Sequence, residues 1–221
     1  MKIISGNSNL ELANAICAYI GVKLTDASFR KFADDEIFVE INENIRGEDV
    51  FIIQSTSHPA NDHLMELLIS IDAAKRGSAK RITAVIPYYG YARQDRKDQP
   101  RVPISARMIL DLMDAAGVDR MITMDLHSPQ IQGFTNVPLD NLYSRIALFK
   151  QLQDYNLNID NGVVLAPDIG SAKMSQSYAK KLGIGFALID KRRPKHNVAE
   201  VVNLIGDLED KHVFIIDDMI D

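Results

Sequence analysis

The run His212-Val213-Phe214-Ile215-Ile216 passes directly into Asp217-Asp218-Met219-Ile220-Asp221, and this stretch decides the fold. Its β-branched and aromatic residues are typical of a buried strand, so the acids that follow lie at the carboxyl end of that strand. Open α/β sheets bind ligands at this edge. Adjacent acids there can hold sugar hydroxyls directly or through Mg²⁺, which prefers hard oxygen ligands. A solvated acidic turn is the alternative, and the apolar run before the acids favours the binding site.

Short apolar runs of the same kind recur along the chain between helical patterns. They lie at 2–5, 50–53, 81–86, 120–124, 162–166, 185–190 and 212–216. Strands that alternate with helices are typical of parallel βαβ units. The sequence therefore predicts an α/β fold with mainly parallel sheets.

Helices are predicted between these strands. In 61–76, apolar residues recur at i, i+3, i+4 and i+7, which gives the helix one apolar face. A second helix is expected over 105–116 with the Ser105 hydroxyl as its cap, and Asp140 is expected to cap a third.

The composition limits the classes of function. Of 221 residues, 46% are hydrophobic and 25% are charged, as in ordinary globular proteins. The net charge of -5 argues against bulk binding of nucleic acid or acidic membranes, because both depend on a basic surface. Cys17 is the single cysteine, and its apolar helical neighbours predict a buried thiol. With neither a membrane-spanning apolar run nor a signal peptide, the sequence predicts a cytoplasmic protein with no membrane partner.

Charged groups that can bind polyphosphate follow the strand predicted at 81–86. Arg93-Gln94-Asp95-Arg96-Lys97-Asp98 lies in a proline-containing stretch ahead of the helix at 105–116, so it is predicted to be a strand-to-helix loop. Its cations can meet phosphates, while Gln94 and the aspartates can contact adenine, ribose or metal-bound water. Charged loops are usually solvated surface, but the tyrosines beside this loop favour a nucleotide site.

Other candidate groups also follow predicted strands. His127 comes after 120–124 and can bind a metal ion or phosphate, although a loop histidine bonded to backbone is the more common role. Asp168 comes after 162–166, ahead of small residues that open a helix, so it could share one cation with His127. Lys191-Arg192-Arg193 comes straight after 185–190, where cations can neutralise charge on a transferring phosphate group. A solubilising basic patch is the alternative there.

Taken together, these residues resemble the ribose-phosphate pyrophosphokinases, also called phosphoribosyl pyrophosphate synthetases. The matching motifs run in family order through the chain and are Phe32-Ala33-Asp34-Asp35-Glu36, Tyr89-Gly90-Tyr91-Ala92-Arg93-Gln94-Asp95-Arg96, Pro103-Ile104-Ser105-Ala106, Asp125-Leu126-His127, Gln130-Ile131-Gln132-Gly133-Phe134, Asp140-Asn141-Leu142-Tyr143, Pro167-Asp168, Lys191-Arg192-Arg193 and the acidic run from Asp217 to Asp221. The resemblance implies two phosphoribosyltransferase-like domains, 1–145 and 146–221, with the second incomplete. It also implies that ATP gives its diphosphoryl group to the C1 hydroxyl of ribose 5-phosphate, with release of AMP and a requirement for Mg²⁺.

The resemblance implies a role for each motif. It assigns ATP binding to Phe32, Asp34, Asp35, Glu36, Arg93, Gln94 and Asp98, metal binding to His127 and Asp168, catalysis to Lys191 and Arg193, and ribose 5-phosphate binding to Arg193, Asp217, Asp218 and Asp221. Homo-oligomers are expected, as hexamers built from dimers. Asp35 stands where the family usually has glycine.

Two other interpretations remain open. One is a catalytically silent regulatory homologue, and the other is an ordinary phosphoribosyltransferase, which would share the acidic run but not the ATP-side motifs. The family continues after Asp221 with a glycine-rich turn that cradles the sugar phosphate, so the sequence is expected to be truncated at its C-terminus. The isolated fragment is then expected to bind ATP weakly and to turn over little ribose 5-phosphate.

Overall fold

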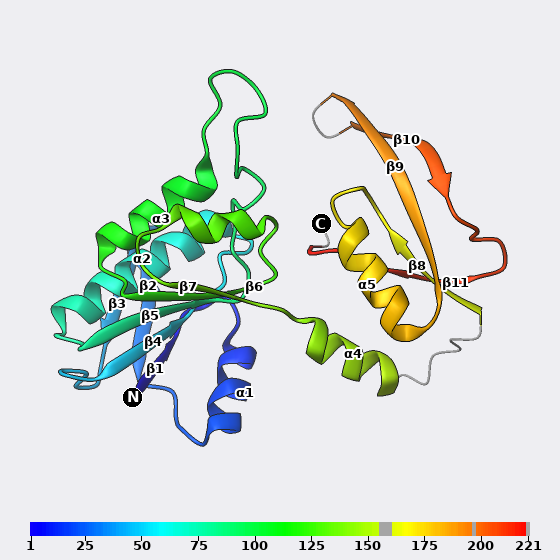
Figure 1. The fold of residues 1–221 in the computed structure, drawn as a ribbon. Helices are drawn as coiled ribbons and strands as arrows, with labels where there is room; N and C mark the ends of the chain where they lie inside the picture. The colour runs from blue at the N-terminus through cyan, green and yellow to red at the C-terminus, as the bar shows by residue number, and fades with distance from the viewer. Residues whose placement is uncertain (155–160, 196–197, 220–221) are drawn as a thin grey trace. The chain divides into compact units, whose positions relative to one another are not determined.

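A computed structural model describes residues 1–154, 161–195 and 198–219 and confirms the predicted α/β fold (Figure 1). The contacts within the chain divide it into two units, Met1–Ser144 and Arg145–Asp221. Each unit has its own sheet and its own hydrophobic clusters. Each unit therefore has its own set of strand ends at which a ligand can bind.

The first unit is built on a five-stranded sheet in the order β1-β4-β5-β6-β7. Its strands are β1 (Lys2–Ser5), β4 (Asp49–Ile53), β5 (Arg81–Ile86), β6 (Arg120–Met124) and β7 (Leu139–Leu142). Every neighbouring pair in this sheet is parallel. All the carboxyl ends therefore lie at one edge, and the turns with the candidate site residues follow them.

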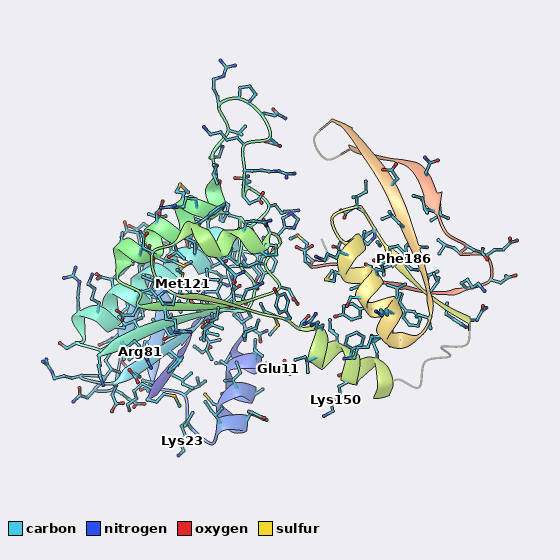
Figure 2. The ribbon with its side chains drawn as sticks, viewed as in Figure 1. Glu11, Lys23, Arg81, Met121, Lys150 and Phe186 are labelled. Carbon is cyan, nitrogen blue, oxygen red and sulfur yellow. The ribbon has the colours of Figure 1, made fainter. Side chains whose placement is uncertain are left out.

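Helices cover both faces of this sheet (Figure 1). On one face, α2 (Ala60–Arg76) and α3 (Ser105–Ala116) pack their apolar sides on the strands, with the Leu67, Leu110 and Met121 side chains fully buried. Figure 2 shows Met121 among these packed side chains, whereas Glu11 and Lys23 turn outward. On the other face, α1 (Leu10–Ile20) packs on β1 and β4.

Cys17 of α1 is 4% exposed and packs in this second cluster, so the predicted buried thiol is confirmed. Burial raises the pKa of the Cys17 thiol. A raised pKa disfavours the reactive thiolate, so Cys17 acts as a small apolar side chain.

The first unit also contains a hairpin that the sequence did not predict. It consists of β2 (Ala27–Lys31) and β3 (Ile37–Ile41), which pair antiparallel, and β3 lies against α2. Its strands mix charged and apolar residues and are only partly buried, so they lack the continuous apolar runs of the parallel sheet.

The second unit has a four-stranded sheet in the order β10-β9-β8-β11. Its strands are β8 (Gly162–Ala166), β9 (Gly185–Lys195), β10 (Val198–Ile205) and β11 (His212–Ile215), and its helices are α4 (Arg145–Asp154) and α5 (Ala172–Leu182). β11, β8 and β9 are parallel to one another, and β10 is antiparallel to β9. Phe149 of α4 stacks on Tyr178 of α5, and both lie in a cluster with Phe186 of the sheet, which Figure 2 labels.

Four details of the predicted elements are wrong. The run 212–216 is predicted to be a buried strand, but β11 lies at the edge of its sheet, where Val213 is 40% exposed and Ile215 is 64% exposed. Asp140 lies in β7 and caps no helix, because 139–142 pairs with β6 and the helix begins only at Arg145. Ser105 is not the cap of α3, since the N-cap residue is Ile104 and the Ser105 hydroxyl donates instead to the Gln94 side chain. β9 continues past Asp190 to Lys195, because β10 pairs with this extension.

No helix in the described part of the chain is both long and apolar enough to cross a lipid bilayer.

Candidate functional site

The tip of the β2–β3 hairpin carries the residues that the family resemblance assigns to adenine. Phe32 is 51% exposed, and its ring meets Phe38 edge to face at 5.5 Å between centroids. The turn closes through the Phe32 N–H, which donates to the Glu36 carbonyl at 2.8 Å. Asp35 adopts a left-handed φ of 68° in this turn. The exposed ring and the carboxylates at the tip are free of core packing, as a base-binding surface requires.

The loop between β5 and α3 carries Arg93, Gln94 and Asp98, as the sequence predicts. The Tyr91 hydroxyl of this loop donates to the Asn61 side chain in the first turn of α2. Lys31, at the base of the hairpin tip, donates to the carboxylate of Asp62 at 2.6 Å, and Asp62 directly follows Asn61.

These contacts bring together two motifs that the family resemblance assigns to ATP. Because Asn61 and Asp62 are adjacent, the hairpin and the loop both meet the first turn of α2. The hydrogen bond from the Lys31 ammonium holds the pKa of the exposed Asp62 carboxyl below its usual range. The structure thus unites residues that lie far apart in the sequence.

The first turn of α3 anchors the middle of the loop. The Gln94 side-chain oxygen accepts from the Ser105 hydroxyl, and its carbonyl accepts from the Ala106 N–H at 3.1 Å. The Tyr89 hydroxyl, from the start of the loop, donates to the Ala106 carbonyl at 2.8 Å. Burial raises the pKa of Tyr89, and the Asp111 carboxylate raises it further, so Tyr89 stays a donor.

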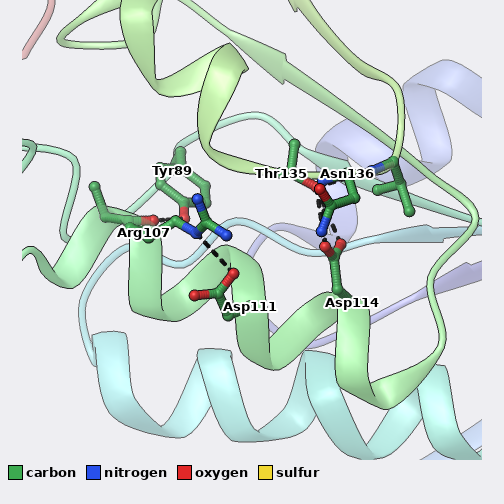
Figure 3. A network of polar contacts seen from close by, with 8 residues as sticks. Tyr89, Arg107, Asp111, Asp114, Thr135 and Asn136 are labelled. Carbon is green, nitrogen blue, oxygen red and sulfur yellow. Dashed lines mark hydrogen bonds and ion pairs between the residues drawn. The ribbon is translucent and has the colours of Figure 1, made fainter.

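Figure 3 shows how α3 is fixed along its length. Arg107 donates to Asp111 at 2.7 Å, one turn along the same helix. Near the end of the helix, the Asp114 carboxylate accepts from the Thr135 hydroxyl at 3.0 Å and from the Asn136 N–H at 3.4 Å. The two bonds of Asp114 tie the end of α3 to the segment that leads into β7. The helix to which Gln94 is bonded is therefore itself held in place.

A buried polar network joins the ends of β1 and β4, and it was not predicted from the sequence. Glu66 of α2 is 5% exposed, and its carboxylate accepts from the Asn7 N–H at 2.6 Å and from the Gln54 amide at 2.9 Å. Gly6 lies so close that a Cβ would meet the Gln54 oxygen at 2.3 Å. The polar run Gln54-Ser55-Thr56 directly after a buried strand was the signal available in the sequence.

His127 is exposed in the turn after β6, at the strand end next to that of β5. Asp125, which opens the turn at a φ of 44°, accepts from the Ser144 N–H at 3.1 Å. Asn141 of β7 accepts from the Leu126 N–H at 3.1 Å. Two contacts to the neighbouring strand end therefore hold the turn that carries His127.

In the second unit, the acids predicted after β8 and β11 come together. β8 and β11 are adjacent and parallel, with Leu165 opposite Ile215, so Asp168 and the pair Asp217-Asp218 follow neighbouring strand ends. Partial burial raises the pKa of Asp217, and the negative charges of Asp218 and Asp168 raise it further. Acids that repel one another in the free protein favour a cation or hydroxyl donors among them.

The basic run lies in the same unit. Lys191 and Arg193 belong to the extension of β9, beyond the point where Ala166 of β8 pairs with Leu188. The backbone of Lys191 pairs with Val201 of β10. Their side chains, and all of Asp221, lie outside the described part of the chain.

His127 and Asp168 belong to different units, so their predicted sharing of one cation stays a prediction. Among the described residues, no group of three or more His, Cys, Asp and Glu side chains could hold a metal ion alone. Mg²⁺ commonly keeps waters and binds through one or two carboxylates together with substrate phosphates. The carboxylates at the ends of β8 and β11 fit such a partial donor set.

Known proteins match the whole chain. Residues 1–117 match a model described as the N-terminal domain of ribose phosphate pyrophosphokinase, and residues 140–221 match a phosphoribosyl transferase domain. A ribose-phosphate pyrophosphokinase of Chlorobaculum tepidum is 57% identical over the whole chain, which covers 68% of that relative. One from Agrobacterium fabrum is 54% identical over the whole chain, which covers 71% of it. The crystal structure of phosphoribosylpyrophosphate synthetase from Mycobacterium smegmatis superposes with a TM-score of 0.88 at 41% identity, over 100% of this chain and 72% of that one.

The fold and the acidic strand ends define an α/β protein of the phosphoribosyltransferase type. The match over 1–117 adds a domain that an ordinary phosphoribosyltransferase has no reason to carry. The chain belongs to the ribose-phosphate pyrophosphokinase family. Its relatives carry the enzyme's name, so the regulatory alternative is not favoured.

Proposed function

We propose that the protein transfers the diphosphoryl group of ATP to the C1 hydroxyl of ribose 5-phosphate, giving phosphoribosyl pyrophosphate and AMP. The observation that carries this proposal is the cluster of Asp168, Asp217 and Asp218 at neighbouring strand ends of a phosphoribosyltransferase-type sheet. Acids at this edge suit the hydroxyls of a sugar phosphate. The ATP-side residues of the first unit separate this reaction from ordinary phosphoribosyl transfer.

On the ATP side, we assign the base to the hairpin tip and the phosphates to the loop after β5. Phe32 offers an exposed ring, and Asp34, Asp35 and Glu36 offer acceptors for the adenine amino group. Arg93, Gln94 and Asp98 hold the ribose and phosphate part of ATP. The shared contact of hairpin and loop with α2 supports this division.

On the sugar side, Asp217 and Asp218 bind the ribose hydroxyls, and Asp221 belongs to the same site. His127 and Asp168 are the proposed protein ligands of Mg²⁺, which when bound neutralises charge on the phosphates of ATP. The raised pKa of Asp217 supports this assignment, because a hydroxyl donor or a cation beside it would favour the ionised carboxylate.

In the transfer itself, the C1 hydroxyl loses its proton to solvent and its oxygen forms a bond to the β-phosphorus of ATP. The bond from that phosphorus to the oxygen bridging it to the α-phosphate breaks, and this oxygen leaves with AMP. Such a reaction depends on alignment and charge neutralisation more than on covalent help from the protein. Lys191 and Arg193 are the proposed cations that meet the developing charge.

The test is the formation of AMP from ATP, ribose 5-phosphate and Mg²⁺. It is measured for the 221-residue chain and for a chimera that continues after residue 221 with the remainder of the Chlorobaculum tepidum relative, of which the chain covers 68%. AMP formation that requires both substrates, in either protein, supports the proposal. Its absence from both proteins would overturn it.

A matched pair of variants locates the sugar site. Asp217→Asn, after β11, should abolish the formation of AMP that depends on ribose 5-phosphate, because it removes the carboxylate that is proposed to bind the sugar hydroxyls. Asp210→Asn, just before β11 at the opposite end of the same strand, should leave the rate within about twofold. Equal loss in both variants would assign the effect to folding.

Two further assignments belong to the same proposal. A homo-oligomer, with hexamers built from dimers, is supported by family membership and by apolar side chains on the surface of α1, where Tyr19 is 93% exposed. Sedimentation velocity measures this directly, and a monomer at all concentrations would contradict it. A cytoplasmic location is supported by the single buried cysteine, which suits a reducing compartment.

A further inference from the structure

Thr56, the residue two positions after the end-of-strand Gln54, holds the start of the loop that carries Arg93 and Gln94. Its side chain is 1% exposed. Its hydroxyl accepts from the Gly90 N–H at 2.6 Å and donates to the Tyr88 carbonyl at 3.2 Å. Its own N–H donates to the same carbonyl at 2.9 Å. Thr56 thus holds the residues before and after Tyr89, which are Tyr88 and Gly90.

We call these contacts of Thr56 with Tyr88 and Gly90 the Thr56 clip. The residue at position 90 of the clip has to lack a side chain. A Cβ on Gly90 would lie 2.4 Å from the Thr56 carbonyl and 3.0 Å from its hydroxyl. Real Cβ atoms do not approach backbone that closely. The close approach of Gly90 to Thr56 is therefore built into both residues.

Thr56 is itself held from behind. The Ser55 N–H donates to the Ser8 hydroxyl at 2.8 Å, and the Ser55 hydroxyl accepts from the Tyr88 N–H at 3.3 Å. The Ser8 N–H in turn donates to the Gln54 side chain, which Glu66 holds. The clip is the outer end of the buried network that joins β1, β4 and α2.

The loop is fixed again only a few residues further on. Gln94 is tied to Ser105 and Ala106 of α3. Arg93 therefore lies between two fixed points, Gly90 on one side and Gln94 on the other. The direction in which Arg93 leaves the backbone depends on both.

We propose that Thr56 is a positioning residue for ATP. Its hydroxyl holds the segment from Tyr88 to Gln94 in the orientation in which Arg93 and Gln94 meet the nucleotide, and it does not touch the nucleotide itself. The inference rests on the proposed function, because it takes ATP as the ligand of this loop. It adds a residue that no motif of the sequence indicated.

Substitutions at Thr56 separate the hydroxyl from the rest of the side chain. Thr56→Val keeps the shape and removes both hydroxyl bonds, whereas Thr56→Ser keeps the hydroxyl and removes only a methyl group. Thr123→Val is the matched control, because Thr123 is a 2% exposed threonine of the same sheet whose hydroxyl has no partner among the described atoms. Gly90→Ala breaks the clip from the loop side and leaves Thr56 intact.

The measurements are the dissociation constant for ATP by calorimetry and the hydrogen exchange of the Gly90 amide by NMR. Thr56→Val and Gly90→Ala should each weaken ATP binding about tenfold, the equivalent of about 1.4 kcal/mol. In Thr56→Val the Gly90 amide should also exchange faster. Thr56→Ser and Thr123→Val should bind ATP within about twofold of the unchanged chain.

Unchanged ATP binding in both Thr56→Val and Gly90→Ala would overturn the inference, and so would a serine variant as weak as the valine variant. If Thr56→Val does not fold, Gly90→Ala and Thr56→Ser still decide the question. An unchanged chain that binds no ATP would overturn the proposed function and this inference together. ATP binding by the unchanged chain without an effect of the variants would overturn this inference alone.

Discussion

Two residues, one at the hairpin tip and one in the β5–α3 loop, have a strained left-handed backbone conformation. Asp35 and Tyr91 have φ values of 68° and 63°, a region that side chains with a Cβ rarely adopt. Both belong to segments assigned to ATP. Strain of this kind persists where the surrounding contacts determine the conformation, and it is common at binding sites.

Asp35→Gly should raise the free energy of unfolding by about 0.5 kcal/mol. Glycine relieves the left-handed strain of about 1–2 kcal/mol, and the greater entropy of the unfolded chain offsets part of that gain. Urea unfolding measures the change. Asp34→Gly is the control, because Asp34 is not among the left-handed residues, and it should lower the free energy of unfolding. A loss of stability in both variants would contradict the prediction.

Tyr89→Phe should cost about 1 kcal/mol at neutral pH, because the hydroxyl bond to the Ala106 carbonyl is lost. The pKa of Tyr89 is raised by burial, so the folded protein keeps this proton while the unfolded chain loses it above a pH of about 10. The unchanged protein therefore loses stability from this group as the pH rises, and the variant does not.

The advantage of the unchanged protein, about 1 kcal/mol at neutral pH, should accordingly fall by about 1.4 kcal/mol for each pH unit above about 10, so that it vanishes within the first unit and then changes sign. Urea unfolding at neutral pH and in this alkaline range measures it. A difference that stays constant over the whole range would show that Tyr89 ionises as readily in the folded protein.

The site residues divide into those that the sequence could predict and those that it could not. His127 and Asp168 follow largely buried strands, whereas the pair Asp217-Asp218 follows the exposed edge strand β11. The place of all of them at strand ends could be read from the alternation of strands and helices. The network around Glu66 could not be predicted, because Asn7 and Glu66 are 59 residues apart and no local pattern marks them as partners. Hydrogen bonds of this kind depend on how the strands are ordered in the sheet.

At the scale of whole elements, the parallel strands other than β7 were predicted and the antiparallel ones were missed. The buried parallel strands are continuous apolar runs, whereas β2, β3 and β10 have a partly exposed face or edge. β7 was missed for another reason. The run Leu139–Leu142 contains Asp140 and Asn141, which resemble a helix cap, and only its pairing with β6 makes it a strand.

Helix α4 depends on one aromatic side chain for its place on the second unit. Phe149 is 7% exposed, stacks on Tyr178 at 4.5 Å between ring centroids and lies beneath the Lys181 ammonium. Phe149→Ala should lower the free energy of unfolding of this unit by about 3 kcal/mol, through lost burial and the cavity that remains. Chemical unfolding measures it.

Ile146→Ala, on the same helix, is the matched control. Ile146 is 76% exposed, so its loss should change the stability by no more than about 0.5 kcal/mol. If both variants cost the same, α4 would not dock through Phe149.

At the scale of the whole molecule, the chain has two units with separate cores and separate sets of strand ends. The residues that we assign to ATP and the predicted metal ligand His127 lie in the first unit, and the acids that we assign to the sugar lie in the second. Under this assignment, each substrate is expected to stabilise one unit in particular.

We expect two unfolding transitions in a calorimetric scan, because each unit has a hydrophobic core of its own. ATP should raise the midpoint of one transition and ribose 5-phosphate with Mg²⁺ that of the other, since a ligand stabilises the part that binds it. Phe149→Ala identifies the transition of the second unit by lowering it. A single transition that shifts with every ligand would contradict the independence of the two units.

The sheet order also has a consequence for how the chain forms during synthesis. β1 lies at the edge of its sheet and pairs with β4 alone among the described strands. Lys2 therefore cannot pair until Val50 has been synthesised. In the sequence, the β2–β3 hairpin comes after β1 and before β4, and its strands pair Ala27 with Ile41. Because local contacts form before distant ones, the growing chain completes its nucleotide-side hairpin while its first strand still has no partner.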